Sequence, residues 1–239
     1  MKNPITSTTI LPARRKEITF RTRDGLSLVG EISAPEAESR ASAIFFHPLP
    51  TAGGFMDSHL IRKASWRLPA LANISVLRFN FRGVSSPRGA SEGVFGEAVE
   101  ERFDLEAALD EAERQGLTNL WLIGWSFGTE VILKHATSHI NRFRGAILLS
   151  PPLHRTSPEE LDLWKRVPNK VTAFIPELDN FLPPQAAREA FSRVANFELI
   201  EAKNSKHLWV GERQTSFVLN EITKRLNPAA YPLPEVWPL

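Results

Sequence analysis

The chain contains no cysteine, so neither disulfide bonds nor thiolate metal sites contribute to its stability. It has no run of about 18 consecutive apolar residues, and we therefore expect no membrane-spanning helix. Residues 1–16 are polar and contain no apolar segment typical of a secretory signal, which favours a cytoplasmic protein. The length of 239 residues fits one α/β domain, and a domain of that size buries enough surface to fold without a metal or a disulfide.

An excess of charge of either sign is also missing, because 29 basic and 27 acidic residues leave a formal net charge of +2. Nucleic-acid binding would need basic side chains gathered on one face. The compact basic run is Arg14-Arg15-Lys16, which we interpret as a solvated N-terminal arm. The glycines at 83 and within 89–96 belong to neither a Walker motif nor a G-x-G-x-x-G motif. We therefore expect no nucleic-acid or nucleotide partner.

Short apolar runs alternate with longer helix-forming stretches along the chain. Asp24-Gly25 separates two of these runs and predicts a β-hairpin. Strands are predicted at residues 17–23, 26–32, 41–46, 74–80, 119–123, 145–149, 170–175 and 197–200, and helices at 56–71, 97–115, 129–136, 183–194 and 214–226. This alternation predicts an α/β fold with a mostly parallel eight-stranded sheet, an N-terminal antiparallel hairpin and helices on both faces.

The pattern also predicts a simple domain organisation, with residues 1–226 forming a single domain. About 20 residues separate the strand that ends near Ser150 from the strand that starts near Lys170. That length can hold one short helix but no cap over the sheet. The tail, residues 227–239, contains four of the 18 prolines and cannot form a regular helix. We expect it to lie extended along the domain, and the alternative is that it docks on a partner subunit of a homodimer.

The segment Gly124-Trp125-Ser126-Phe127-Gly128 matches the pattern G-x-S-x-G. This pattern places a serine on a tight turn between a strand and a helix, where flanking side chains would clash with neighbouring backbone. An apolar run at 119–123 precedes the motif and a helix-forming stretch at 129–136 follows it, as the mechanism requires. We therefore predict that Ser126 is a nucleophile.

A serine nucleophile needs a base and an acid, and both are expected directly after strands of a parallel sheet. The chain order for a serine at such a turn is serine, acid, histidine. Asp179 follows the strand at 170–175 and is the preferred acid, with Glu177 as the competing candidate. His207 lies between the last strand and the last helix and is the predicted base.

Backbone N–H groups are predicted to stabilise the oxyanion. One is the N–H of Phe127, directly after the proposed nucleophile, and the other comes from the loop after the third strand. In that loop Pro48 and Pro50 have no N–H, which leaves Leu49 as the donor. For His47, at the start of the loop, we favour a structural role.

Large apolar residues flank the predicted catalytic residues and suggest an apolar acyl site. Those predicted to line the substrate pocket are Trp125, Phe181, Leu182 and Trp209.

Three segments resemble the α/β-hydrolase superfamily, in particular its small bacterial members without a cap, near the dienelactone-hydrolase-like and serine-peptidase-like branches. They are residues 47–56, residues 77–84 and the motif at 124–128. The resemblance covers nearly the whole chain and implies hydrolysis of an ester, a thioester or an amide through an acyl-enzyme. It implies the same catalytic triad, Ser126, Asp179 and His207, and the same oxyanion donors. The segment Ser85-Ser86-Pro87-Arg88-Gly89 departs from the family pattern, in which a Gly and then Ser-x-Gly follow Arg-Gly-Val.

The expected function is therefore a serine hydrolase that acts on a small acyl ester. The alternatives are a thioesterase or peptidase with the same triad, and a non-catalytic binding protein on the same fold. The mechanism needs no cofactor, and His47, Asp57, His59 and Glu97 do not have a metal-ligand spacing.

Overall fold

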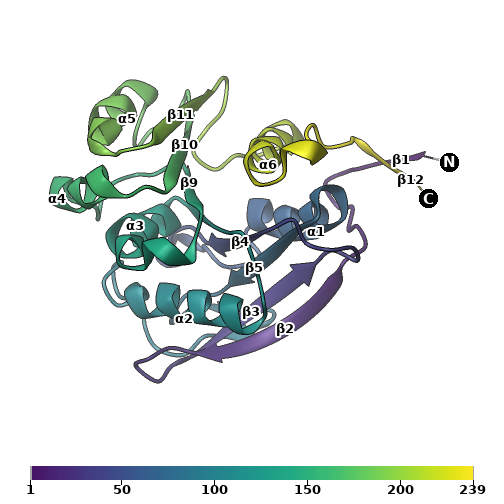
Figure 1. Ribbon diagram of the computed structural model, residues 1–239, viewed down its shortest axis with the longest axis horizontal. Helices are drawn as coiled ribbons and strands as arrows, with labels where there is room; N and C mark the ends of the chain where they lie inside the picture. The colour runs from purple at the N-terminus through teal and green to yellow at the C-terminus, as the bar shows by residue number, and fades with distance from the viewer. Residues whose placement is uncertain (1, 239) are drawn as a thin grey trace.

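The computed structural model describes residues 2–238 and contains one eight-stranded sheet (Figure 1). The strand order across the sheet is β11-β10-β9-β8-β4-β5-β3-β2. Neighbours from β11 to β5 pair in parallel, whereas β3 is antiparallel to both β5 and β2. The predicted fold class and the N-terminal hairpin are confirmed. The strands are β2 Arg14–Arg21, β3 Ser27–Ala34, β4 Ala41–Phe46, β5 Ile74–Phe79, β8 Leu120–Trp125, β9 Gly145–Leu149, β10 Lys170–Pro176 and β11 Phe197–Ala202.

Helices cover both faces of this sheet. On one face lie α1 (His59–Ala72) and α6 (Glu212–Leu226), and on the other α2 (Glu101–Arg114), α3 (Phe127–His135), α4 (Pro158–Asp162) and α5 (Pro184–Ala190). Successive residues of a central strand serve opposite faces: Phe45 packs with α1 and α6, and Phe46 packs with α2 and α3. Each fully buried side chain of this size contributes about 1.5–3 kcal/mol relative to an exposed one. The core therefore consists of two apolar layers separated by the sheet.

Several predicted element boundaries were wrong, and backbone conformation explains the largest error. Helix α2 begins at Glu101 rather than at 97, because Glu97 and Ala98 have φ of +54° and +63°, which no α-helix accommodates. Helix α1 begins at His59, three residues after its predicted start. The predicted helix 183–194 is α5 followed by a separate 3-10 turn, Phe191–Arg193, and a further 3-10 segment, Ala136–Arg142, extends α3.

The sequence did not predict two short strand pairs. β6 (Ser85–Ser86) pairs with β7 (Gly89–Ala90), and β1 (Lys2–Pro4) pairs with β12 (Val236–Pro238) near the two chain ends. Pairs of two or three residues are too short to show the alternation that identifies strands. The tail before β12 contains a 3-10 turn, Pro228–Ala230, and contacts α6.

The predicted N-terminal arm is also corrected. Arg14, Arg15 and Lys16 are the first residues of β2, paired with β3, although their side chains are exposed.

No lid crosses the carboxyl edge of the sheet within residues 2–238. The connection between β9 and β10 holds only α4 and the 3-10 turn Leu163–Arg166, as its length predicted. Ser157 caps α4 by accepting the Glu160 N–H, and the Glu160 carboxylate accepts the Ser157 N–H. None of the helices described is both long and apolar enough to cross a membrane.

His47 links the loops that follow β4 and β5 from a fully buried position. Its Nδ1–H donates to the Pro48 carbonyl (2.7 Å), and its Nε2 accepts the Phe81 N–H (3.0 Å). Burial lowers the pKa of His47 to about 4, because the imidazolium would lose its hydration. A neutral ring is what this pair of hydrogen bonds requires, since Nε2 must keep a lone pair. The expected structural role fits this geometry.

This depressed pKa predicts a specific loss of stability in acid. Between pH 6.5 and about 4 the unfolded chain protonates His47 and the folded chain does not, so stability falls as pH falls. A shift of this size corresponds to about 3 kcal/mol of unfolding free energy. The stability advantage of wild type over His47→Gln, measured by urea unfolding, should shrink by that amount between pH 7 and pH 4.

Groups such as Asp104, whose pKa burial raises to about 6, titrate in both proteins and cancel in this difference. A difference between the two proteins that stays constant over this pH range would contradict the assignment.

Candidate active site

Ser126 occupies the turn between β8 and α3 in a backbone conformation that is rare outside glycine. Its φ and ψ are +51° and −117°. Hydrogen bonds hold the turn: the Ser126 N–H donates to the Leu149 carbonyl (2.8 Å), and the Thr129 N–H (2.9 Å) and hydroxyl (2.6 Å) donate to the Ser126 carbonyl. The strained turn is fixed by its surroundings, and the side chain of Ser126 is free of the helix that follows it.

The two glycines of the motif allow the backbones around the turn to meet. A Cβ at Gly124 would lie 2.6 Å from the Gly128 carbonyl oxygen, and a Cβ at Gly128 would lie 2.1 Å from the carbonyl oxygen of Phe46 on β4. Neither position has room for a side chain without moving backbone. The clash inferred from the G-x-S-x-G pattern is therefore confirmed.

The three residues predicted as a triad meet in one hydrogen-bonded chain at the carboxyl edge of the sheet. His207 Nε2 lies 2.9 Å from Ser126 Oγ, and His207 Nδ1 lies 2.9 Å from Asp179 Oδ2 and 3.1 Å from Oδ1. Because a carboxylate only accepts, Nδ1 carries the proton and donates it to Asp179, which leaves Nε2 to accept from the serine hydroxyl. The Asp179 side chain is 1% exposed and that of His207 12% exposed.

Asp179 rather than Glu177 contacts His207. The Glu177 carboxylate accepts the Asn204 N–H (2.8 Å) and pairs with the Lys203 ammonium (3.1 Å), and both contacts lower the pKa of Glu177. Glu177 therefore faces the neighbouring loop, where it helps to join the segments after β10 and β11.

Two hydrogen-bond donors that the sequence did not predict fix the backbone carbonyl of His207. The Ser150 hydroxyl (3.1 Å) and the Trp125 indole N–H (3.3 Å) both donate to the His207 carbonyl. His59 on α1 bonds the Trp209 carbonyl (3.2 Å), two residues further along the same loop. The signal for Ser150 was its position directly after a strand, at the edge where functional side chains gather.

Two of the predicted pocket residues lie in the core instead. Trp125 is 2% exposed and Trp209 is fully buried, and both pack in the apolar layer that contains α1 and α6. From this layer the Trp125 indole N–H reaches the His207 loop, where it donates to the His207 carbonyl. Phe181 is 52% exposed, with its ring centroid 4.5 Å from that of His207, and Leu208 is 53% exposed. Leu182 is half-buried against the core.

The two predicted oxyanion donors have free N–H groups. Neither the Leu49 N–H nor the Phe127 N–H has a hydrogen-bond partner in the described part of the chain. The Leu49 loop is compact, because the Leu49 carbonyl accepts the N–H groups of Ala52 (3.1 Å) and Gly54 (2.9 Å). Leu49 follows β4, the strand next to β8, so its loop adjoins the serine turn.

A hollow of about 230 Å³ opens between the loops that follow β4 and β5. Its lining contains no charged side chain and consists of Pro50, Thr51, Gly53, Gly54, Phe55, Gly83, Val84, Ser85 and Phe95. The ring of Phe95 packs 5.2 Å from that of Phe127, directly after Ser126. The hollow therefore lies on the side of the serine turn opposite to Asp179 and His207, which follow β10 and β11.

The arrangement can activate a hydroxyl for attack on a carbonyl carbon. His207 can take the serine proton, Asp179 can stabilise the resulting imidazolium, and free N–H groups can receive an oxyanion. No group of three His, Asp or Glu side chains between residues 2 and 238 is placed to hold a metal ion.

No family model matches the chain. A curated protein of Rickettsia prowazekii (strain Madrid E), described as uncharacterized, is 28% identical over 169 residues. This match covers 69% of the present chain and 66% of the Rickettsia protein, slightly less than two thirds of its length.

Solved structures match over almost the whole chain. A Xanthomonas campestris protein described as an α/β serine hydrolase without a lid has a TM-score of 0.73 at 25% identity and covers 94% of this chain and 99% of its own. A serine hydrolase homologue from Coxiella burnetii has a TM-score of 0.72 at 22% identity, with 90% and 96% covered. An esterase from Pyrococcus furiosus has a TM-score of 0.74 at 17% identity, with 95% and 97% covered. The chain therefore has the α/β-hydrolase fold, without a lid, that these solved structures share.

Proposed function

We propose that this chain is a serine hydrolase that cleaves a carboxylic ester through an acyl-enzyme on Ser126. The observation that carries the proposal is the unbroken hydrogen-bonded chain from Ser126 Oγ through His207 to Asp179. The strained serine turn supports it, because strained backbone of this kind clusters at active sites.

In the proposed reaction His207 Nε2 takes the proton of Ser126 as Oγ attacks the carbonyl carbon. The negative charge that develops on the carbonyl oxygen is met by the N–H groups of Leu49 and Phe127. His207 then gives the proton to the leaving alkoxide, which departs as an alcohol and leaves an ester on Ser126. Water, activated by the same imidazole, hydrolyses this ester and releases the carboxylic acid.

The surroundings of the site favour a small, neutral, partly apolar substrate. Phe181 and Leu208 present exposed apolar surface beside His207, and the uncharged hollow has room for a short acyl or alcohol group. A Pyrococcus furiosus protein with the same fold is described as an esterase, which supports esters as the first substrates to test. Thioesters and aminoacyl amides remain the alternative substrates for the same triad.

Covalent labelling tests the nucleophile. A fluorophosphonate should label the wild-type protein. Ser126→Ala should abolish this labelling and should lower the rate of p-nitrophenyl butyrate hydrolysis at least about 10³-fold. Ser192→Ala removes an exposed serine hydroxyl and should leave both unchanged. Folded wild-type protein that does not label would refute the proposal and favour a non-catalytic binding protein.

The two acid candidates can be separated by isosteric substitution. Asp179→Asn cannot hold the Nδ1–H tautomer of His207 and should lower kcat by about 10⁴-fold. Glu177→Gln should change kcat by less than about 3-fold, because Glu177 contacts only the neighbouring loop. Steady-state rates of both variants give the comparison, and equal losses would contradict the assignment of Asp179.

Removing the Ser150 hydroxyl should let His207, the proposed base, move more freely without changing the groups that bind substrate. Ser150→Ala leaves the His207 carbonyl with one donor and should lower kcat about 10-fold at a nearly unchanged KM, because small displacements of a catalytic group are costly. Ser75→Ala is the matched control, since Ser75 is also buried and hydrogen-bonded but lies at the far end of its strand. Equal kcat values in the two variants would exclude a positioning role for Ser150.

A further inference from the structure

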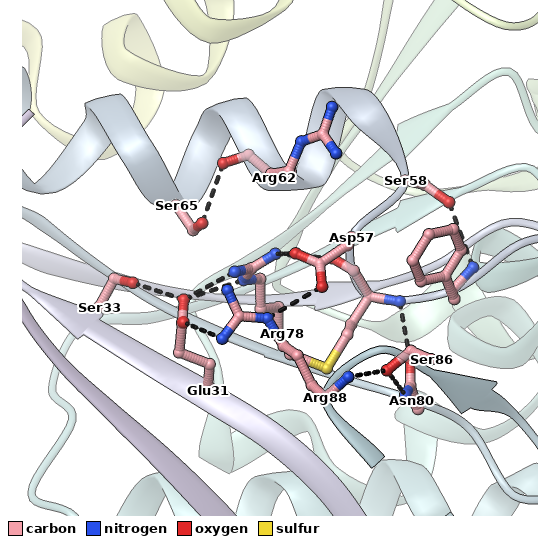
Figure 2. Close-up of polar contacts among 12 residues, drawn as sticks. Glu31, Ser33, Asp57, Ser58, Arg62, Ser65, Arg78, Asn80, Ser86 and Arg88 are labelled. Atoms are coloured by element: carbon pink, nitrogen blue, oxygen red, sulfur yellow. Dashed lines mark hydrogen bonds and ion pairs between the residues drawn. The ribbon is translucent and has the colours of Figure 1, made fainter. Parts of the chain in front are cut away.

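Four charged side chains form a closed ring near the start of α1 (Figure 2). Glu31 comes from β3, Arg78 from β5, Asp57 from the segment before α1, and Arg88 from the turn between β6 and β7. Each carboxylate contacts both guanidinium groups. Glu31 lies 2.8 Å from Arg78 Nη2 and 3.0 Å from Arg88 Nη1, while Asp57 lies 2.9 Å from Arg88 Nε and also pairs with Arg78. We call this ring the ion tetrad.

The ion tetrad is mostly shielded from water. The Arg78 side chain is fully buried and that of Glu31 is 2% exposed, with Asp57 at 12% and Arg88 at 28%. Two positive and two negative charges cancel, but bringing four ions out of water costs about as much as their attraction returns. Apolar side chains in the same space would usually be at least as stable. The ring therefore contributes little to the net stability of the fold. Its planar guanidinium groups instead fix the orientation of the groups that they bond, which apolar packing does not do.

The ion tetrad is hydrogen-bonded to the backbone at the end of the loop that carries Leu49. Arg78 Nη1 donates to the Met56 carbonyl (3.2 Å), and the Met56 N–H donates to the Asn80 side chain (2.9 Å). Asn80 in turn donates to the Ser86 hydroxyl (2.9 Å) on β6 (Figure 2). Both polar groups of the Met56 peptide backbone are thus bonded to side chains of one strand, β5, and its continuation.

The other end of the same loop is tied to the same strand. His47 accepts the Phe81 N–H, one residue after Asn80. The loop from residue 47 to residue 57 is therefore fixed at both ends to the end of β5, and Leu49 lies between the two attachments. Both attachments therefore constrain the segment that carries the Leu49 N–H.

We propose that the ion tetrad is a positioning device for the oxyanion loop, acting through Met56 and Asp57 to hold the Leu49 N–H in the direction that a tetrahedral intermediate needs. This inference rests on the proposed function. Glu31, Asp57, Arg78 and Arg88 touch no reacting atom, so they are positioning residues. Weakening the ring should raise the energy of the oxyanion state more than that of the bound substrate.

The test uses Asp57→Asn, which keeps the shape of the side chain and removes the charge that bridges the two arginines. We expect kcat for p-nitrophenyl butyrate to fall 10- to 100-fold with KM within about 3-fold of wild type. Affinity for hexyl trifluoromethyl ketone should fall by a similar factor. This probe forms a hemiketal: Ser126 Oγ adds to the ketone carbon, the serine proton passes to His207, and the ketone oxygen takes the negative charge.

Two further variants separate positioning from general stability. Arg88→Lys alters the most exposed member of the ring, and a single ammonium group cannot make both contacts of the guanidinium. This variant should lower kcat and ketone affinity by similar factors, each smaller than in Asp57→Asn. Glu198→Gln is the matched control, because Glu198 also bridges two cations, Lys170 and Arg225, but at the amino end of the sheet. It should leave both readouts unchanged, and thermal unfolding monitors the fold of each variant.

The inference is overturned if folded Asp57→Asn or Arg88→Lys keeps wild-type kcat and ketone affinity. It is also overturned if KM rises as much as ketone affinity falls, because uniform weakening would mean that the ring shapes only the substrate pocket. These outcomes leave the proposed function intact as long as the wild-type protein labels with a fluorophosphonate. Wild-type protein that neither labels nor binds the ketone would overturn the proposed function and this inference together.

Discussion

The backbones of β4, β8 and α3 touch at Gly124 and Gly128, and the geometry of the candidate site depends on that contact. Because no side chain separates the strands from the helix, the turn at Ser126 is forced into its rare conformation and cannot relax. The carbonyl of Phe46 that contacts Gly128 is the last group of β4, so the loop with Leu49 begins at the same point. One close packing contact therefore sets the proposed nucleophile and the start of the proposed oxyanion loop together.

The remaining parts of the site are fixed to this contact by polar groups rather than by apolar packing. Ser150 and Trp125 hold the backbone of His207, and the ion tetrad with Asn80 holds the end of the Leu49 loop. Hydrogen bonds have narrow preferred directions, so they can orient loops that lie at the surface, where side-chain packing is incomplete. Because the site has no lid within the described residues, no second domain packs on its loops, and these hydrogen bonds hold the loops in place instead.

Much of the fold could be predicted because buried strands leave apolar runs and turns leave glycine. The order of Ser126, Asp179 and His207 also followed from the position of each residue after a strand. The features that could not be predicted depend on how side chains pack and on which distant segments meet in the folded chain. Trp125 and Trp209 adjoin catalytic candidates in sequence, yet both point into the core. The ion tetrad needs the pairing of Glu31 with Arg78 across two strands, and nothing local in the sequence specifies that register.

In the proposed reaction Ser126 carries the acyl group during turnover. Rapid mixing with p-nitrophenyl butyrate, quenching in acid and mass analysis of the peptides would test it most directly. If Ser126 is the nucleophile, a butyryl adduct should form on the peptide that contains it, together with a burst of about one p-nitrophenolate per chain. Steady hydrolysis without a burst and without any adduct on that peptide would contradict it.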